Sequence, residues 1–371
     1  MARSMVSRRG IRLAGSCDTL PKAKPRISAR TDCSLPAAAA EDDWQSVLAG
    51  AVSDPAELCR LVGLPAAVAA EATRAIRQFP LRVPRTYLAR IRGGDPGDPL
   101  LAQILPTGRE LADAPHFLPD PLGEAASTCP TGLLRKYKGR LLILASGTCG
   151  VHCRFCFRRH YKDPPHGNGG AFGKGGNSWE VAVSRIAAEE SIEEVILSGG
   201  DPLVLPDTRL AELAGALAAI PHLRRLRVHT RMPIVIPQRV TDSLVAWLRG
   251  TRLAPWVVVH ADHPAELDAA VAAALTRLVD AGIPVLHQAV LLAGVNDRAD
   301  VLAELCGRLA DLRVVPYYLH QLDRVAGAAH FEVPVARGVK LIESLRARLP
   351  GYAVPRYVRD TPGSAGKEVL A

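Results

Sequence analysis

The sequence has no uncharged apolar run long enough to cross a membrane. Its 371 residues are 48% hydrophobic, but no stretch of about 18 uncharged apolar residues occurs. The motif Ser7-Arg-Arg-Gly10 is also not followed by the apolar segment that an export signal needs. We therefore expect neither a transmembrane helix nor export.

Outside its first forty residues the chain also has no marked excess of either charge. The formal net charge is +9, but residues 1–40 contain eight Lys or Arg and two Asp, and the other 331 residues contain 38 basic and 35 acidic side chains. No basic stripe is visible, so we expect no nucleic-acid partner. Residues 1–40 are rich in Arg, Ser, Pro and Ala, and we expect a disordered basic tail.

The cysteines show no pattern of disulfide pairing. Five of the eight are scattered along the chain, and this distribution favours the reducing cytoplasm. They are Cys17, Cys33, Cys59, Cys129 and Cys306. The glycine-rich residues 167–176 lack the Lys-Ser/Thr ending of a phosphate-binding loop, and we expect a flexible surface insertion there.

The remaining three cysteines, Cys149, Cys153 and Cys156, have C-x3-C-x2-C spacing directly after the apolar run Leu141–Ala145. Such a run predicts a buried parallel strand, so the cysteines lie on the loop at its carboxyl end. An iron–sulfur cluster normally has four cysteine ligands. With only three, a [4Fe–4S] cluster would keep one iron open, and the spacing resembles that of radical S-adenosylmethionine (SAM) enzymes. The alternatives are buried structural cysteines or a zinc site completed by His152 or His160.

The chain before the cysteines indicates a helical module and a wrap, residues 41–130. Apolar residues at helical spacing begin at Trp44, and Asp54-Pro55 predicts a helix N-terminus. Residues 92–130 are rich in glycine and proline and predict loops.

After the cysteines, strands alternate with helices. The expected strands are Leu141–Ala145, Glu194–Leu197, Leu226–Thr230, Trp256–His260, Pro284–Leu291 and Arg313–Tyr318, each followed by a helix. This alternation predicts an α/β fold with a parallel sheet. Six units are too few for a closed eight-fold barrel, and they match the partial (β/α)6 barrel of radical SAM enzymes. We expect this barrel over residues 131–350 and a separate C-terminal segment over residues 351–371.

The second strand ends in Ser198-Gly199-Gly200-Asp201. Glycines let backbone approach a ligand closely, and an acid beside them could bind an ammonium group. Taken alone, the motif would be a plain strand–helix turn; after the cysteine loop we favour SAM binding.

Several segments together resemble the lysine 2,3-aminomutase family over residues 41–371. They are Tyr137-Lys-Gly-Arg140, Cys153-Arg-Phe-Cys-Phe-Arg-Arg-His160, Ser198-Gly-Gly-Asp-Pro202, Pro233-Ile-Val-Ile-Pro-Gln-Arg239, Gln288-Ala-Val-Leu-Leu-Ala-Gly-Val-Asn-Asp297 and Pro316-Tyr-Tyr-Leu-His320. The chain is most similar to the branch whose (R)-β-lysine is used to modify elongation factor P.

The resemblance implies three cofactors: a [4Fe–4S] cluster, SAM and pyridoxal 5′-phosphate (PLP). It implies that Lys367 forms a Schiff base with PLP and that Tyr137 and Arg140 hold the PLP phosphate. Gln288 matches a SAM contact, as does the Ser198–Asp201 motif. Taken alone, Lys367 would be an exposed terminal lysine, and Tyr137 and Arg140 ordinary surface residues.

For the substrate, the resemblance implies that Arg158 binds the carboxylate of L-lysine and that Asp323 and Asp360 receive its distal ammonium. A guanidinium suits a carboxylate because both are planar and can pair twice. The implied reaction converts L-α-lysine to β-lysine, with an electron donor such as flavodoxin or ferredoxin. An aminomutase for another amino acid and a non-catalytic iron–sulfur sensor are the alternatives.

Overall fold

The computed structural model describes residues 44–124, 128, 132–161 and 178–371. The predicted disordered tail of residues 1–40 and the predicted insertion of residues 167–176 lie outside these ranges. Among the helices described, none has the length and apolar character to span a membrane.

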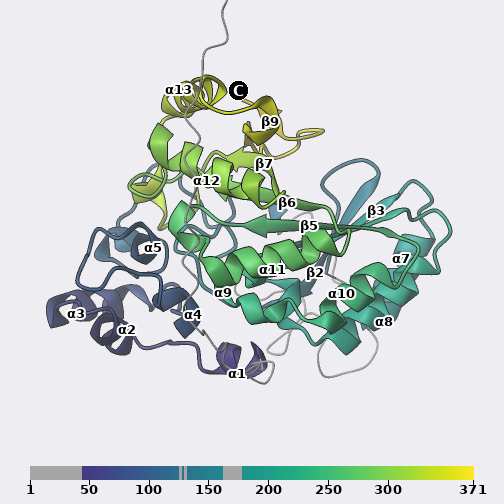
Figure 1. Cartoon of the computed structure of the whole chain (residues 1–371), viewed down its shortest axis with the longest axis horizontal. Helices are drawn as coiled ribbons and strands as arrows, with labels where there is room; N and C mark the ends of the chain where they lie inside the picture. The colour runs from purple at the N-terminus through teal and green to yellow at the C-terminus, as the bar shows by residue number, and fades with distance from the viewer. Residues whose placement is uncertain (1–43, 125–127, 129–131, 162–177) are drawn as a thin grey trace, which may run out of the picture. The chain divides into compact units, whose positions relative to one another are not determined.

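An open sheet in the order β1 to β9 lies at the centre of the described chain (Figure 1). The strands are β1 (Leu133–Leu134), β2 (Arg140–Ser146), β3 (Glu194–Gly199), β4 (Arg225–Thr230), β5 (Ala254–His260), β6 (Val285–Val290), β7 (Val315–His320), β8 (Arg356–Arg359) and β9 (Glu368–Val369). Strands β2 to β8 are parallel, and β1 and β9 add antiparallel edges. The predicted α/β fold with a largely parallel sheet is confirmed.

Helices follow each of the strands β2 to β7, as the alternating pattern predicts. The α-helices are α1 (Trp44–Ala49), α2 (Pro55–Leu61), α3 (Ala66–Ala75), α4 (Arg85–Leu88), α5 (Pro99–Ala102), α7 (Ser178–Ala187), α8 (Asp207–Ala218), α9 (Met232–Val235), α10 (Asp242–Arg249), α11 (Ala269–Asp280), α12 (Ala299–Asp311) and α13 (Val335–Arg346). The 3-10 helices are η1 (Gly108–Leu111), η2 (Pro202–Val204), η3 (Pro237–Arg239), η4 (Pro264–Glu266), η5 (Ala329–Phe331) and η6 (Gly351–Ala353).

The C-terminal segment contains a strand that the sequence did not predict. Arg356–Arg359 form β8, a further parallel strand beside β7. The chain then turns back and pairs as β9, with Arg359 opposite Glu368. The residue predicted to carry PLP therefore lies in the connection of a β-hairpin at the sheet edge.

Local sequence explains these elements. The side chain of Asp54 accepts hydrogen bonds from the backbone of Ala56 and Glu57, which confirms the predicted N-cap of α2. In α11, which crosses the front of the sheet in Figure 1, Val271, Leu275 and Leu278 are buried. Their spacing of four and three residues gives the helix one apolar face, so it packs on the sheet.

The N-terminal helices α1 to α5 share one hydrophobic core with the strand–helix units. Polar contacts join them to α9 and η4, the short helices that follow β4 and β5. Arg90 donates to the carbonyls of Ile234 and Glu266, each at 2.7 Å, and Thr86 donates to the carbonyl of Val235 at 2.5 Å. The helical module thus covers loops at the carboxyl ends of the strands, where sites form in parallel barrels.

Candidate active site

The loop after β2 carries Cys149, Cys153 and Cys156, all free thiols. Burial raises the pKa of each thiol, that of Cys153 to about 11. No three His, Cys, Asp or Glu side chains in the described ranges lie close enough together to share one metal ion. Cysteine thiolates are the ligands of iron–sulfur clusters, so the chemistry of this loop fits such a cluster.

A buried carboxylate fixes the conformation of the cysteine loop. Glu110 of η1 accepts hydrogen bonds from Arg154 at 2.7 and 2.9 Å and from Arg159 at 2.5 Å. None of the three side chains is exposed in these pairs. Because both arginines belong to the loop and Glu110 to the wrap, this contact joins segments more than forty residues apart.

Gly199 and Gly200 at the end of β3 lie against the cysteine loop. A Cβ atom on Gly199 would be 2.5 Å from the carbonyl oxygen of Ser146, and one on Gly200 would be 2.2 Å from that of Thr148. Gly199 also has φ +115°, which disfavours other residues. The glycines therefore permit close approach of protein backbone, whether or not they also contact SAM.

Asp201 is buried and fully engaged. One carboxylate oxygen accepts from the backbone of Leu203 at 3.0 Å and from Thr230 Oγ1 at 2.7 Å, and the other accepts from the backbone of Arg231 at 2.6 Å and of Met232 at 3.2 Å. A carboxylate has about four acceptor sites, and these donors use four. The structure thus gives Asp201 a role in joining β3 to the loop after β4, and its predicted contact with SAM stays a prediction.

The guanidinium of Arg158 points to the end of β3. It donates to the carbonyl of Gly199 at 2.9 Å and lies 3.5 Å from Ser198 Oγ. Its other nitrogens pair with both carboxylate oxygens of Glu124, at 2.7 and 3.1 Å. Arg158 therefore forms a bidentate pair with a carboxylate. The prediction was such a pair with the substrate carboxylate, and in this structure the partner is Glu124.

Lys367 reaches the centre of the site. Its ammonium contacts Asp360, whose carboxylate also accepts from Tyr137 Oη at 2.6 Å and lies 3.2 Å from Lys136 Nζ. Burial alone would raise the pKa of Asp360, but Lys367 and Lys136 outweigh it and lower the value. Burial lowers the pKa of Lys367, against the opposing effect of Asp360. The predicted residues Lys367, Asp360 and Tyr137 therefore form one connected group.

Asp323 lies beside this group, just after β7. Burial and the charge of Asp360 raise its pKa to about 7, although Lys367 acts in the opposite direction. His320, at the end of β7, is 3.9 Å from Asp360, and burial lowers its pKa to about 3. The neighbourhood thus combines an ionised acid, an acid that titrates near neutrality and a neutral imidazole.

Arg140 and Gln288 occupy different strands. Arg140 begins β2, and its guanidinium is 5.2 Å from the centre of the Tyr137 ring. Gln288 of β6 is half-buried and paired in register with His260 and Tyr318 of the neighbouring strands. The Tyr318 ring in turn lies 5.8 Å from Lys367 Nζ.

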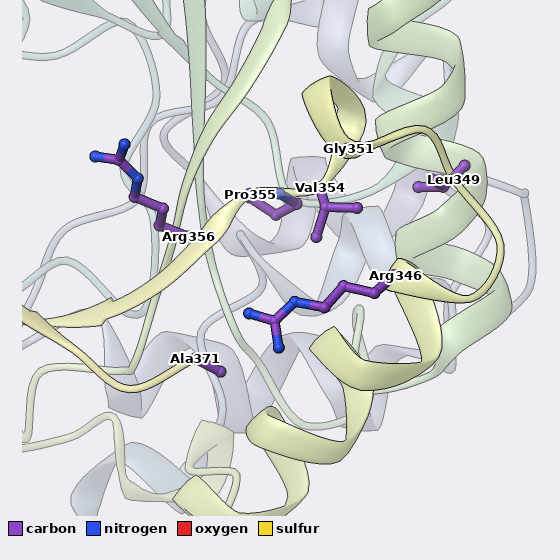
Figure 2. A pocket seen from close by; sticks show the side chains of 7 residues that line it. All are labelled: Arg346, Leu349, Gly351, Val354, Pro355, Arg356 and Ala371. Atoms are coloured by element: carbon purple, nitrogen blue, oxygen red, sulfur yellow. The ribbon is translucent and has the colours of Figure 1, made fainter. Parts of the chain in front are cut away.

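A cavity of about 560 Å³ is lined by both Asp323 and Asp360. Residues on either side of Lys367, including Pro362 and Glu368, also line it. A smaller hollow of about 230 Å³ lies beside the end of α13, and none of the predicted site residues lines it (Figure 2). It is lined by Arg346, Leu349, Gly351, Val354, Pro355, Arg356 and Ala371. Of these two cavities, the larger one is lined by predicted site residues and the smaller one is not.

Sequence reasoning did not find Lys136, Glu124 or Tyr318. Lys136 could have been suspected, because it adjoins Tyr137 in a segment already assigned to phosphate binding. Glu124 has no comparable signal, since it lies in a proline-rich wrap without a periodic pattern. Its importance follows only from its contact with Arg158.

Comparison with known proteins finds several L-lysine 2,3-aminomutases that are similar to this chain over most of its length. An L-lysine 2,3-aminomutase of Haemophilus influenzae is 41% identical over 332 residues, covering 89% of this chain and 96% of that protein. One of Escherichia coli is 43% identical over 330 residues, covering 89% and 94%. One of Clostridium subterminale is 34% identical over 331 residues, covering 88% and 77%.

Solved structures are more distant. The SAM-bound protein anSMEcpe is 14% identical and aligns with 55% of this chain and 57% of its own, with a TM-score of 0.42. A radical SAM methyltransferase from Sphaerobacter thermophilus is 20% identical and covers 61% of this chain and 68% of its own, with a TM-score of 0.41. No family model matches the chain.

Proposed function

The chain belongs to the lysine 2,3-aminomutase family, and from this premise we propose that it is an isomerase that converts L-α-lysine to (R)-β-lysine. One observation carries the proposal. Asp360 pairs with the alkylammonium group of Lys367, and a second acid, Asp323, lies beside this pair. Two acids at one cavity suit a substrate with a distal positive charge, because a buried cation without a partner is costly.

Three groups would supply the chemistry. A [4Fe–4S] cluster with SAM would supply radical chemistry for removing a hydrogen atom from the substrate, and PLP would carry the migrating amino group. The cluster would be held by Cys149, Cys153 and Cys156 on one loop. The protein's part is to position these groups and to exclude water.

The PLP site would be made by Lys367, Tyr137 and Arg140. Burial lowers the pKa of Lys367 and thus favours the neutral amine needed to attack an aldehyde. Arg140 is available for a phosphate, since guanidinium–phosphate contacts are strongly charge-assisted. Lys136 adds a second positive charge 3.2 Å from Asp360.

The substrate would lie between Arg158 and the two acids. Arg158 already pairs with a carboxylate, that of Glu124, so its geometry is compatible with an amino-acid carboxylate. The SAM contacts would come from Ser198, Gly199, Gly200, Asp201 and Gln288. We further propose that the enzyme is cytoplasmic and receives electrons from a flavodoxin or ferredoxin. A separate ligase would attach its product, β-lysine, to elongation factor P.

The test is anaerobic reconstitution with iron, sulfide and PLP, followed by incubation with SAM, a reductant and L-lysine. Chromatography should detect β-lysine with the wild-type protein and none with Lys367→Ala. Parallel reactions with L-glutamate and L-arginine measure substrate choice. Turnover of either in preference to lysine, or no isomerisation by a protein that holds all three cofactors, would contradict the proposal.

A further inference from the structure

Arg231 lies beside one of the cysteines but belongs to a different part of the chain. It follows β4 directly and precedes α9, and its side chain is 6% exposed. One terminal nitrogen of the guanidinium donates to Cys153 Sγ at 2.7 Å. A buried positive charge therefore contacts a sulfur atom that would coordinate iron.

The other terminal nitrogen fixes the orientation of the guanidinium. It donates to Gln103 Oε1 at 2.5 Å and to Glu266 Oε2 at 2.8 Å, and it lies 3.6 Å from Asp262 Oδ2. Gln103 in turn donates to Glu266 at 3.2 Å. Since these partners are buried, Arg231 cannot turn away from Cys153 without losing several contacts.

One donor of Arg231 is still free in the part of the chain that the structure describes. Its Nε is buried without a hydrogen-bond partner among those residues. An unpaired buried donor is unfavourable unless a bound group supplies an acceptor. A cluster on the neighbouring cysteine is such a group, because its sulfur atoms accept hydrogen bonds.

The charges around Cys153 have a direct electrostatic consequence. Reduction of a [4Fe–4S] cluster by one electron adds one negative charge, and no bond is made or broken. A positive charge nearby stabilises the reduced form, and a negative charge destabilises it, most strongly in a region of low dielectric constant. Hydrogen bonds to the sulfurs and local charge are established determinants of cluster potential.

We propose that Arg231 raises the reduction potential of the cluster through its hydrogen bond to Cys153, and that Glu266 limits this effect. This inference rests on the proposed function, because it requires that the three cysteines hold a [4Fe–4S] cluster. Arg231 is then a positioning residue that acts through the cysteine. It makes the cluster easier to reduce by a low-potential one-electron donor. Glu266 limits the size of this increase in reduction potential, because its negative charge opposes that of Arg231.

The experiment is a redox titration of anaerobically reconstituted full-length protein without SAM, with titanium(III) citrate as reductant and detection by electron paramagnetic resonance. Arg231→Gln should favour the oxidised cluster at least about tenfold, a shift of ~59 mV to more negative potential for one electron. Arg231→Lys, which keeps the charge, should shift less. Glu266→Gln should shift the potential in the opposite direction.

Arg239→Gln is the matched control. Arg239 is also fully buried and paired with an acid, Asp207 at 2.7 Å, but its hydrogen-bond partners among the described residues include no cysteine. It should leave the potential unchanged. A structural disturbance would shift the potential without regard to the sign of the charge removed, so opposite shifts in Arg231→Gln and Glu266→Gln distinguish tuning from damage.

Iron analysis accompanies each titration. Equal potentials in wild type, Arg231→Gln and Glu266→Gln, or shifts of the same sign in both variants, overturn the inference while leaving the proposed function intact. Loss of iron from both variants means that the network holds the loop rather than tunes the cluster, and overturns it too. A wild-type protein without iron contradicts the proposed function itself.

Discussion

Two aspartates of the same site have opposite pKa shifts because their neighbours differ. Asp360 contacts Lys367 and Tyr137 and lies near Lys136, so its pKa is lowered. Asp323 is buried near the negative charge of Asp360, and its pKa is raised to about 7. Asp323 is thus partly protonated at neutral pH, and the arrival of an ammonium group would favour its charged carboxylate form.

At the residue scale, Asp323→Asn should reduce activity toward lysine. Removing one partner of a buried charge pair costs roughly 3–5 kcal/mol, and each ~1.4 kcal/mol is tenfold. We therefore expect kcat/KM for lysine to fall by at least about a hundredfold in steady-state assays, with the cluster and PLP spectra unchanged. Glu332→Gln is the control, because Glu332 lines the same cavity but forms an exposed pair with Arg324. Normal use of lysine by Asp323→Asn would refute the assignment.

The raised pKa of Asp323 also predicts a pH-dependent stability. The ordinary aspartate pKa is 3.8 and the folded value about 7, so between these values the folded state binds more protons than the unfolded state. Stability from this group is therefore present below about pH 4 and is lost as pH rises to about 7.

Denaturant unfolding of the reconstituted protein between pH 4 and 9 measures this loss. The wild type should lose up to about 1.4 kcal/mol per pH unit relative to Asp323→Asn between pH 4 and 7, and the two curves should run parallel above pH 8. Parallel curves over the whole range would show that Asp323 titrates normally.

At the scale of elements, the cysteine loop depends on the 3-10 helix η1. Glu110 is the carboxylate that accompanies both Arg154 and Arg159, with no exposure of any of the three side chains. Glu110→Gln would leave two buried guanidinium groups without their counter-charge. We expect the free energy of unfolding to fall by about 3–5 kcal/mol, measured by denaturant titration.

Glu57→Gln gives the matched comparison. Glu57 pairs with Arg85 at 2.5 Å, but both side chains are well exposed, at 30% and 57%. Exposed pairs contribute little, so the loss should stay within about 1 kcal/mol. A loss from Glu110→Gln no larger than this would mean that the wrap does not hold the loop.

At the scale of the whole molecule, the hairpin of β8 and β9 brings the C-terminal segment to the start of the sheet. The hydrogen bond between Tyr137 and Asp360 joins residues 223 positions apart. As a result two lysines, Lys136 and Lys367, meet at one carboxylate. Because both amines lie at the same carboxylate, both are candidates for the bond to an aldehyde cofactor such as PLP.

The two lysines are equally exposed, at 24% for Lys136 and 23% for Lys367, but they differ in position. Lys367 lies in the β8–β9 connection with its Nζ 5.8 Å from the centre of the Tyr318 ring, and burial lowers its pKa. We expect borohydride reduction of the PLP-loaded protein, followed by peptide mass mapping, to find the label on Lys367. Lys136→Arg, which keeps the positive charge, should retain the label, and Lys367→Ala should lose it. A label on Lys136 in the wild type would reverse the assignment.

The sequence alone determined much of the fold. Strands β2, β3 and β5 contain continuous apolar runs, and each strand from β2 to β7 is followed by a helix; both patterns are local. The N-cap at Asp54 and the position of the cysteines after β2 are equally local, because a few neighbouring residues decide them. Strand β8 was missed, since Tyr357 and Val358 are the only buried residues in its four-residue length.

Only the tertiary structure decided how the polar residues pair. The sequence shows Asp201 beside two glycines, but three of its four donors come from the end of β4 and the two residues that follow it. It shows Arg158, but not that Glu124 occupies its guanidinium. Hydrogen bonds and ion pairs act over a few ångströms, even between residues 223 positions apart such as Tyr137 and Asp360, and no local pattern encodes such partners. The types of chemical group were therefore readable from the chain, and their contacts were set by folding.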